Sequence, residues 1–269
     1  MIHFREIDGS DFLFLIPFAV IIVLWTLVSK FGIINPVLIS NPFQVAETIW
    51  NLLIKQTADG HSVLLTHIGQ SYFRLFISFI IAALIGVGFG ILLGAREKWY
   101  LFFNPVLTIL MPIPGIAWAP IFMLWIGFGD PTIITVAALA AFFPIVYNTA
   151  AGVRHMEKEL IWAARSMGAK NSTLFLRVYI PHAAAYIFTG LRLGLARGWR
   201  TVIAVEMIAA SLWGLGFMIF DAREYLLPSV IYAGIIILAV SYYLLDSVLI
   251  RWIESRTIDR WGMRETGGL

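Results

Sequence analysis

Long charge-free stretches recur along the chain and predict helices that cross a membrane. A spanning helix needs about 20 predominantly apolar residues, and six segments approach that length. They are 12–29, 75–95, 99–129, 131–153, 183–208 and 226–245. The third is interrupted by four prolines, and the fifth contains charged residues. The pattern therefore predicts an all-α membrane protein with about six transmembrane helices.

A more polar stretch separates the first two predicted spans. Its apolar positions Val45, Ile49, Leu52 and Leu53 follow a helical period, which predicts a short amphipathic helix at the membrane surface. We therefore expect a single transmembrane domain over 1–269. Its expected parts are an N-terminal helix in 1–35, an extracytoplasmic amphipathic segment in 36–72, a core in 73–253 that includes a loop in 154–181, and a tail in 254–269.

Composition supports this class, and the basic residues orient it. Hydrophobic residues make up 60% of the chain and charged residues 13%, whereas soluble domains carry about 25% charged residues. With the N-terminus inside, 12 of the 19 Lys and Arg residues fall in cytoplasmic segments, as the positive-inside rule requires. We expect a multi-pass protein of the cell inner membrane with both termini cytoplasmic. Its net charge of +3 then needs no nucleic acid partner.

Small residues recur every four positions in the second predicted span, at Ala82, Gly86, Gly90 and Gly94. Such spacing stacks small side chains on one helix face and lets another helix approach closely. We expect close packing, within the fold or across a dimer, rather than a pore lining.

The loop 154–181 is too polar to span the membrane and too apolar for a plain linker. Leu160, Ala163, Ala164 and Met167 form an apolar face at helical spacing. A second short helix is expected over 173–181, ending at a proline that lacks a backbone donor. The loop therefore predicts a helix–turn–helix along the membrane, with Gly168 near the bend and a shallow surface suited to a partner's groove.

The same loop resembles the EAA motif of ABC-importer permeases, which runs Glu-Ala-Ala, three residues, Gly, nine residues, Ile, one residue, Leu-Pro. Here the spacing is kept, and Trp stands where the family has Glu. The resemblance implies that the loop couples the membrane domain to an ATPase. The residues given that role are Trp162, Ala163, Ala164, Arg165, Met167, Gly168, Val178, Ile180 and Pro181.

Segments 112–131, 190–199 and 205–226 are similar to the nitrate, taurine and aliphatic-sulfonate branch of that family. The resemblance implies a type I ABC-importer permease fold with cytoplasmic coupling helices. It also implies a second permease copy in a homodimer or heterodimer, two ABC ATPase subunits that bind ATP and Mg, and an extracytoplasmic solute-binding protein. No cofactor is implied on this chain, which carries no phosphate-binding loop and is not expected to be an enzyme.

Charged residues in the fifth predicted span are candidates for the cargo path, because charge inside a bilayer is costly unless paired or hydrated. Arg192, Trp199 and Glu206 share a helix face at seven-residue spacing. We expect Arg192 to be structural and Arg197 and Arg200 to line the path of an anion. The alternative is that these arginines bond to carbonyls of the third span or pair with the glutamate.

The proline-rich break of the third span is a second candidate for the path or a gate, because non-helical backbone is tolerated where it lines a wet cavity. A packed kink is the alternative. The residues concerned are Met111, Pro112, Pro114 and Trp118. The histidines are scattered without metal-ligand spacing, so no metal site is expected.

The cargo itself is left open by the sequence. A small anion of the taurine or sulfonate, nitrate or bicarbonate type is the favoured reading. An aryl carboxylate and a neutral pyrimidine-type compound are alternatives. A self-sufficient secondary transporter is less favoured, since it predicts an internal repeat and the chain carries none.

Overall fold

The computed structural model describes residues 16–31, 35, 38–156, 158–174, 178–210 and 212–250, and within these ranges it is helical with no β-strand. The part of the expected N-terminal segment before Ile16, Arg177 of the polar loop and the expected tail 254–269 lie outside the described residues. The chain divides into two compact units. The first comprises 1–66 with 218–237, and the second comprises 67–217 with 238–269.

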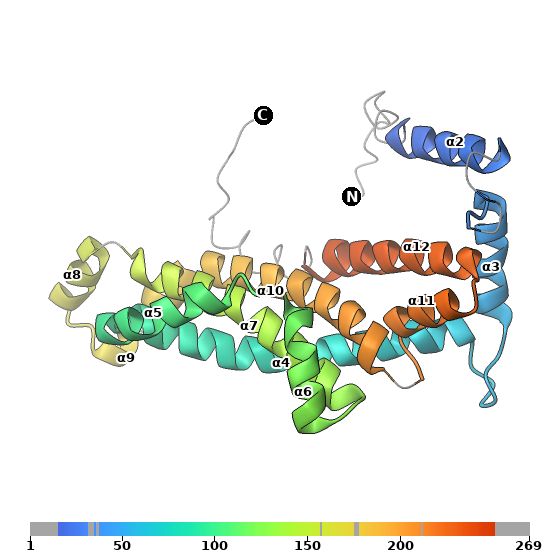
Figure 1. The fold of residues 1–269 in the computed structure, drawn as a ribbon. Coiled ribbons are helices and arrows are strands. Elements are labelled where there is room, and N and C mark those ends of the chain that lie inside the picture. The colour runs from blue at the N-terminus through green and yellow to red at the C-terminus, as the bar shows by residue number, and fades with distance from the viewer. Residues whose placement is uncertain are drawn as a thin grey trace. The chain divides into compact units, whose positions relative to one another are not determined.

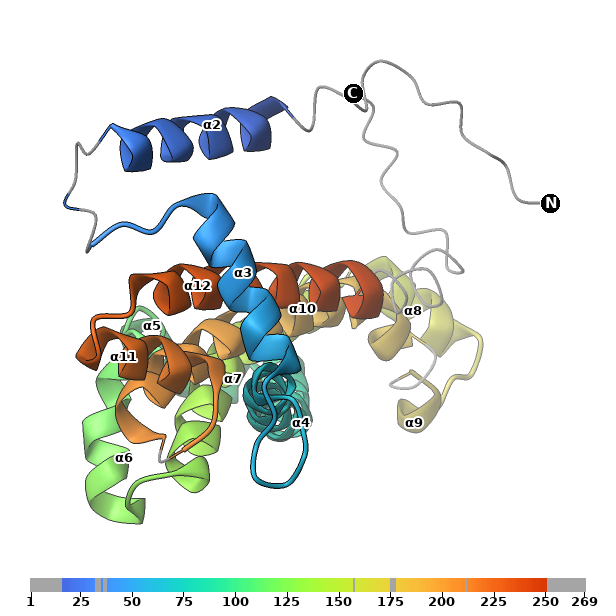
Figure 2. The same ribbon diagram turned by 90° about the vertical axis from the view of Figure 1, so that its right-hand side faces the viewer.

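The first unit contains α2 (Ile16–Lys30), α3 (Pro42–Ile54) and most of α11 (Leu215–Glu224). Helix α3 begins at a capping box: the Asn41 side chain accepts from the Gln44 amide at 2.8 Å, and the Gln44 side chain accepts from the Asn41 amide at 3.0 Å. These two bonds satisfy donors that a helix start leaves free. The helix occupies the stretch expected to be amphipathic, and Figure 2 shows α2 and α3 as two separate helices.

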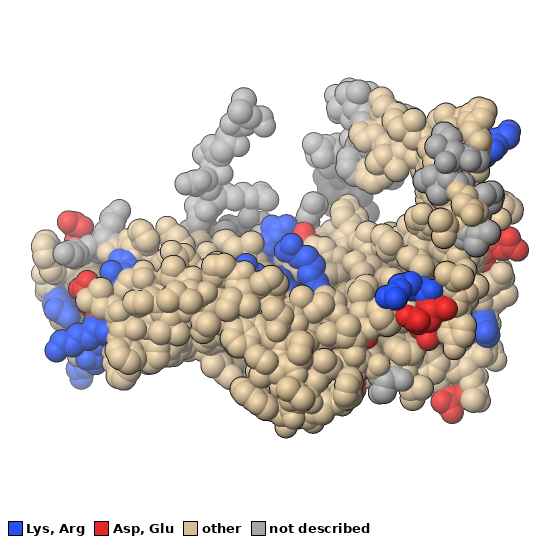
Figure 3. Space-filling model, viewed as in Figure 1, with Lys and Arg blue, Asp and Glu red and all other residues tan. Residues whose placement is uncertain are grey.

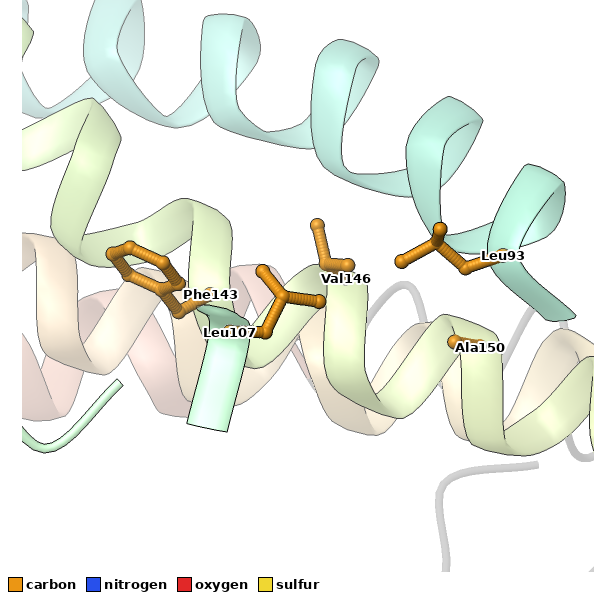
Figure 4. Packing of buried hydrophobic residues seen from close by; sticks show 5 residues of the cluster. All are labelled: Leu93, Leu107, Phe143, Val146 and Ala150. Carbon is orange, nitrogen blue, oxygen red and sulfur yellow. The ribbon is translucent and has the colours of Figure 1, made fainter. Parts of the chain in front are cut away.

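The second unit is built on α4 (Val63–Ala95), α7 (Asp130–Arg154) and α10 (Ile180–Ala209), which run alongside one another in Figure 1. Helices α7 and α10 pack together along their lengths. A hydrophobic cluster joins α7 to α4 and to α5 (Glu97–Leu110), and Figure 4 shows its side chains. The buried members are Leu93, Leu107, Phe143, Val146 and Ala150.

The third predicted span is broken in the structure. Helix α5 is followed by a 3-10 turn (Gly115–Trp118) and α6 (Ala119–Ile126), and the two parts are bent by 94°. Figure 1 shows α6 turned away from α5. Pro112 and Pro114 lie at the break, where the missing amide donors prevent the helix from continuing. The break expected from the prolines of the third span is therefore present, and it lies at Pro112 and Pro114.

Among the described residues, three helices are long and apolar enough to span a membrane, or four if the bent pair counts as one span. The three are α4, α7 and 228–247, which starts with α12 (Pro228–Leu244). Helix α10 matches the fifth predicted span, and its 30 residues are long enough, but its charges make it more polar than these. Helix α2 is apolar but has only 15 residues.

Two predicted boundaries are wrong. Helix α4 begins at Val63, twelve residues before the expected start at Leu75, because Arg74 lies inside the helix rather than at its end. Pro181 lies at the first positions of α10 rather than ending a second loop helix, since the N-terminal turn of a helix also tolerates a residue without an amide donor. The loop helix before it, α9, covers only Asn171–Leu174.

Candidate functional site

A fully buried ion pair joins α4 to α10. The side chains of Arg74 and Glu206 are 3% and 0% exposed, and Arg74 Nη1 lies 2.7 Å from Glu206 Oε1. The Ser71 hydroxyl donates to the same carboxylate at 2.9 Å. A buried charge is tolerated when it is paired and its remaining lone pairs are hydrogen-bonded, and both conditions are met here.

The same guanidinium reaches a second acid at the start of α7. Arg74 Nη2 lies 2.7 Å from Asp130 Oδ1, and Arg74 Nε donates to that oxygen at 2.8 Å. Gln70 Nε2 donates to the other carboxylate oxygen at 3.0 Å. One cation therefore links two carboxylates from α7 and α10, and it does so from the middle of α4.

The loop between α10 and α11 is fastened onto one face of α4. His67, Ser71 and Arg74 follow one another at helical spacing, and each contacts backbone within 213–215, at the end of the loop and the start of α11. Arg74 Nη1 donates to the Trp213 carbonyl at 2.7 Å. The other contacts are the Leu215 amide to Ser71 Oγ at 2.8 Å, the Gly216 amide to Glu206 Oε2 at 2.9 Å, and His67 Nδ1 at 3.1 Å from the Gly214 amide.

Gly214 allows this fastening. Its φ of +142° lies in a region that side chains rarely adopt, and a Cβ there would lie 2.6 Å from the Glu206 carboxyl carbon. Only glycine fits both the conformation and the approach. A larger residue at position 214 would therefore disturb the contacts that join the loop, the ion pair and α4.

Two residues expected along the path lie in the interior instead. Glu206 is fully buried and pairs with Arg74 rather than with an arginine of α10. Trp199 is 2% exposed and stacks on Tyr72, with ring centroids 5.4 Å apart. At Trp199 and Glu206, the shared face of α10 therefore packs against α4.

The three arginines of α10 have different surroundings. Arg192 pairs with Asp246, and Arg192 Nη2 lies 2.8 Å from Asp246 Oδ2. Asp246 belongs to the π-helical turn Leu245–Ile250, which follows α12. Arg197 Nη1 donates to the Met111 carbonyl at 3.2 Å, and Arg200 Nε donates to the Ala196 carbonyl of its own helix at 3.1 Å. Within the described part of the chain, no acid pairs with the last two arginines.

The break of the third span lies against α10 at the level of these arginines. Besides the bond from Arg197 to Met111, a Cβ on Gly115 would lie 2.6 Å from Thr201 Oγ1 and 2.9 Å from Ala140 Cβ. Trp118 and the prolines at 112 and 114 belong to the same turn and are not fully buried. The two sequence-based candidates for the path therefore meet in the structure.

The glycines of α4 lie against α7. A Cβ built on Gly90 would be 2.6 Å from Thr149 Cβ, and one built on Gly94 would be 2.5 Å from Val153 Cβ. At Gly86 the nearest atom is Ile145 Cγ2, at 2.9 Å. These spacings leave no room for a side chain, so the two helix backbones approach closely here.

The polar loop begins with α8 (Lys158–Ser166), which ends in a Schellman motif. The Ala169 amide donates to the Ala164 carbonyl at 3.0 Å, and the Gly168 amide donates to the Arg165 carbonyl at 2.9 Å. The φ of Gly168 is +81°, the left-handed conformation that this cap requires. The chain therefore reverses sharply after α8.

The helix α8 presents large side chains to solvent. Trp162 is 62% exposed and Met167 80% exposed, while Ala163 and Arg165 are also exposed and Ala164 is half-buried. Val178, Ile180 and Pro181 are half-buried. Figure 3 shows Lys and Arg side chains gathered over the end of the second unit that carries α8, in contrast to the surface over α6.

Residues 86–259 match the sequence model of the binding-protein-dependent transport system inner membrane component. The chain belongs to that family. It is therefore a multi-pass permease of the inner membrane and a component of an ABC importer, not an enzyme.

Several curated proteins resemble this permease over most of its length. The taurine transport system permease protein TauC of Escherichia coli K12 is 33% identical over 85% of this chain and 82% of its own. The putative aliphatic sulfonates transport permease protein SsuC of Bacillus subtilis 168 is 32% identical over 90% and 85%, respectively. The nitrate import permease protein NrtB of Synechocystis is 30% identical over 90% and 88%.

A solved structure has the same fold as the permease. A chain of the inward-facing MetNI methionine ABC transporter matches 74% of the permease and 99% of its own length, with a TM-score of 0.58 and 18% identity. No group of three or more His, Cys, Asp or Glu side chains suited to a metal ion occurs among the described residues.

Sequence reasoning missed Arg74, Asp130, Ser71 and Asp246. Arg74 directly precedes the predicted span 75–95, and Asp246 directly follows the predicted span 226–245. The available signal was the charge of the fifth span, because buried arginines and glutamates need partners in other helices.

Proposed function

We propose that this permease passes a small anion, of the taurine or sulfonate, nitrate or bicarbonate type, that an extracytoplasmic binding protein delivers. The observation that carries the proposal is the position of Arg197 and Arg200 on α10, with no acid partner among the described residues. Arg200 is exposed and Arg197 half-buried. The similar permeases are named for the transport of taurine, nitrate and bicarbonate, which supports a small anion or zwitterion as the substrate here.

The free-energy cost of placing a charge in lipid favours a water-filled path around these two side chains. A guanidinium at bilayer depth costs at least ~2.5 kcal/mol unless it is paired or hydrated. Counting ~1.5 Å per residue, Arg197 and Arg200 lie well up α10 from its start at Ile180. A path that accepts anions hydrates both groups and supplies their counterions, and the guanidinium fork suits carboxylate, sulfonate, nitrate and bicarbonate.

We further propose a homodimer with type I topology, about six spans in each copy and both termini in the cytoplasm. Two ATPase subunits that bind ATP and Mg would dock on α8 and the turn at Gly168. The exposed Trp162 and Met167 support this role, because large exposed apolar side chains beside basic ones are typical of docking surfaces. Trp162 would then provide an apolar contact where the family motif has a carboxylate.

Uptake in cells with and without the gene tests the cargo class. The compounds to compare are nitrate, bicarbonate, taurine, an aryl carboxylate and a neutral pyrimidine, each isotope-labelled. We expect the uptake of one anion or of taurine to depend on the gene. Gene-dependent uptake of the pyrimidine alone would contradict the proposal and leave Arg197 as a structural bond to the Met111 carbonyl.

A further inference from the structure

The ion pair between Arg192 and Asp246 has the geometry with which a guanidinium binds a carboxylate ligand. Arg192 Nε donates to Asp246 Oδ1 at 3.1 Å, and Arg192 Nη2 donates to Asp246 Oδ2 at 2.8 Å. Two parallel bonds of this kind are the usual way in which arginine recognises a planar anion. Asp246 therefore accepts from the two guanidinium donors, Nε and Nη2, that a carboxylate or sulfonate ligand would otherwise use.

This pair is accessible, unlike the one at Glu206. The Arg192 side chain is 43% exposed and the Asp246 side chain 24% exposed, whereas Arg74 and Glu206 are 3% and 0% exposed. Breaking a partly exposed pair costs less than breaking a fully buried one. The Arg192–Asp246 pair is therefore able to exchange partners, while the buried pair is not.

Other groups beside the pair could receive Asp246 if it moved. Arg200 lies two helical turns after Arg192 on α10, and Tyr242 lies one turn before Asp246. The two helical segments that carry the pair therefore also carry a second guanidinium and a phenol within about two turns of it.

We propose that Asp246 is a built-in counter-anion, which holds Arg192 when no cargo is bound and exchanges with anionic cargo during passage. This inference rests on the proposed function, because it requires an anion as cargo. When cargo arrives, the bonds from Arg192 to Asp246 break and equivalent bonds to the cargo form. When cargo leaves, Asp246 returns.

Because Asp246 is part of the same protein as Arg192, it competes with free anions for that arginine. A carboxylate attached to the same protein acts at an effective concentration in the millimolar range or above. It therefore weakens the binding of free anions to Arg192 and promotes their release, and a transport path needs sites that bind weakly enough to let the solute leave. Anions that bind guanidinium poorly, such as chloride, would not displace it.

Anion binding by the purified full transporter tests the proposal. The complex of this chain with its ATPase would be titrated with methanesulfonate and with nitrate, and the shift of the thermal midpoint would give an apparent Kd. Asp246→Asn should bind the probes at least about fivefold more tightly than the unmodified protein, because the competing charge is removed. The double variant that combines Asp246→Asn with Arg192→Gln should not show this tighter binding.

The controls separate competition from damage. Asp221→Asn removes an exposed acid of α11 and should leave the Kd unchanged. Asp246→Glu keeps the charge and should bind like the unmodified protein, and Asp246→Ser provides a second neutral variant if the asparagine variant does not fold. A neutral variant that folds and binds the probes no more tightly than the unmodified protein would overturn the inference.

The uptake assay distinguishes this failure from failure of the proposed function. If an anion is imported and the neutral variants show unchanged Kd values, only the role of Asp246 is wrong. If only the neutral pyrimidine is imported, the cargo class is wrong and the counter-anion role falls with it.

Discussion

Arg74 and Glu206 meet at 2.7 Å across α4 and α10, and neither side chain is more than 3% exposed. Removing one partner of a buried pair leaves the other charge without compensation, which typically costs about 3–5 kcal/mol. We therefore expect Arg74→Gln to lower the thermal stability of the purified protein strongly and to reduce the amount of inserted protein. Thermal unfolding in detergent, followed by fluorescence-detected size exclusion, measures this effect.

Ser71→Ala is the matched control for that experiment. It removes a hydroxyl from the same network while leaving both charges paired, and should cost about 1–3 kcal/mol because the Leu215 amide loses its acceptor. An Arg74→Gln variant no less stable than Ser71→Ala would show that the ion pair is not the main contact in this network.

The packing of α4 against α7 predicts a sharp difference between neighbouring glycines. Gly90→Ala places a Cβ 2.6 Å from Thr149 Cβ and 2.8 Å from the Val146 carbonyl, and overpacking of this kind costs about 1–3 kcal/mol. Gly88→Ala meets nothing within 4 Å and should be neutral or slightly stabilising. Thermal midpoints of the two variants test the difference, and equal values would contradict the close approach.

The turn after α8 predicts a defect in transport rather than in insertion. Gly168→Trp puts a bulky residue at a φ of +81°, which costs about 1–3 kcal/mol of local strain and changes the surface proposed to dock the ATPase. We expect wild-type membrane levels with uptake abolished. Both are measured in the same cells, by immunoblot and by labelled cargo.

Gly60→Trp is the control for backbone strain alone. Gly60 has a similar φ of +78° and nothing within 4 Å of its Cβ position, but it lies in the turn between α3 and α4. It should keep uptake near normal. Normal uptake by the Gly168→Trp variant would contradict the coupling role.

If Arg197 and Arg200 line the path of an anion, replacing either arginine should reduce the uptake of that anion. Arg200→Gln removes an exposed guanidinium that donates to the Ala196 carbonyl of its own helix, so uptake should fall about tenfold or more with little change in stability. Arg197→Gln should reduce uptake similarly and also loosen the break at Met111. Arg223→Gln, an exposed arginine paired with its neighbour Glu224, should be silent, and equal uptake by all three variants would refute the path.

The sequence was most informative where apolar length decides the structure. The spans expected at 131–153 and 183–208 correspond to α7 and α10 within a few residues, because long apolar runs flanked by charges leave few alternatives. It was least informative at charged residues within helices. Arg74 marks no boundary, since its charge is neutralised by acids that lie 56 and 132 residues further along the chain.

Proline positions were also ambiguous in the sequence. A missing amide donor is compatible with the end of a helix, its first turn or a kink. The structure uses Pro181 at a start, whereas Pro105 and Pro144 lie inside helices. The choice depends on tertiary contacts that a local pattern does not contain, such as the approach of Gly115 to α10.

The long sequence separation of Arg74 and Glu206 has a consequence for biosynthesis. At about 5–20 residues per second, roughly ten seconds pass between the translation of α4 and that of its partner glutamate, 132 residues later. Of the two acids that pair with Arg74, Asp130 is translated first, 56 residues after the arginine, and Glu206 follows much later. The network around Arg74 is therefore complete only when α10 arrives, so the final seating of α4 against α10 is a late step of assembly.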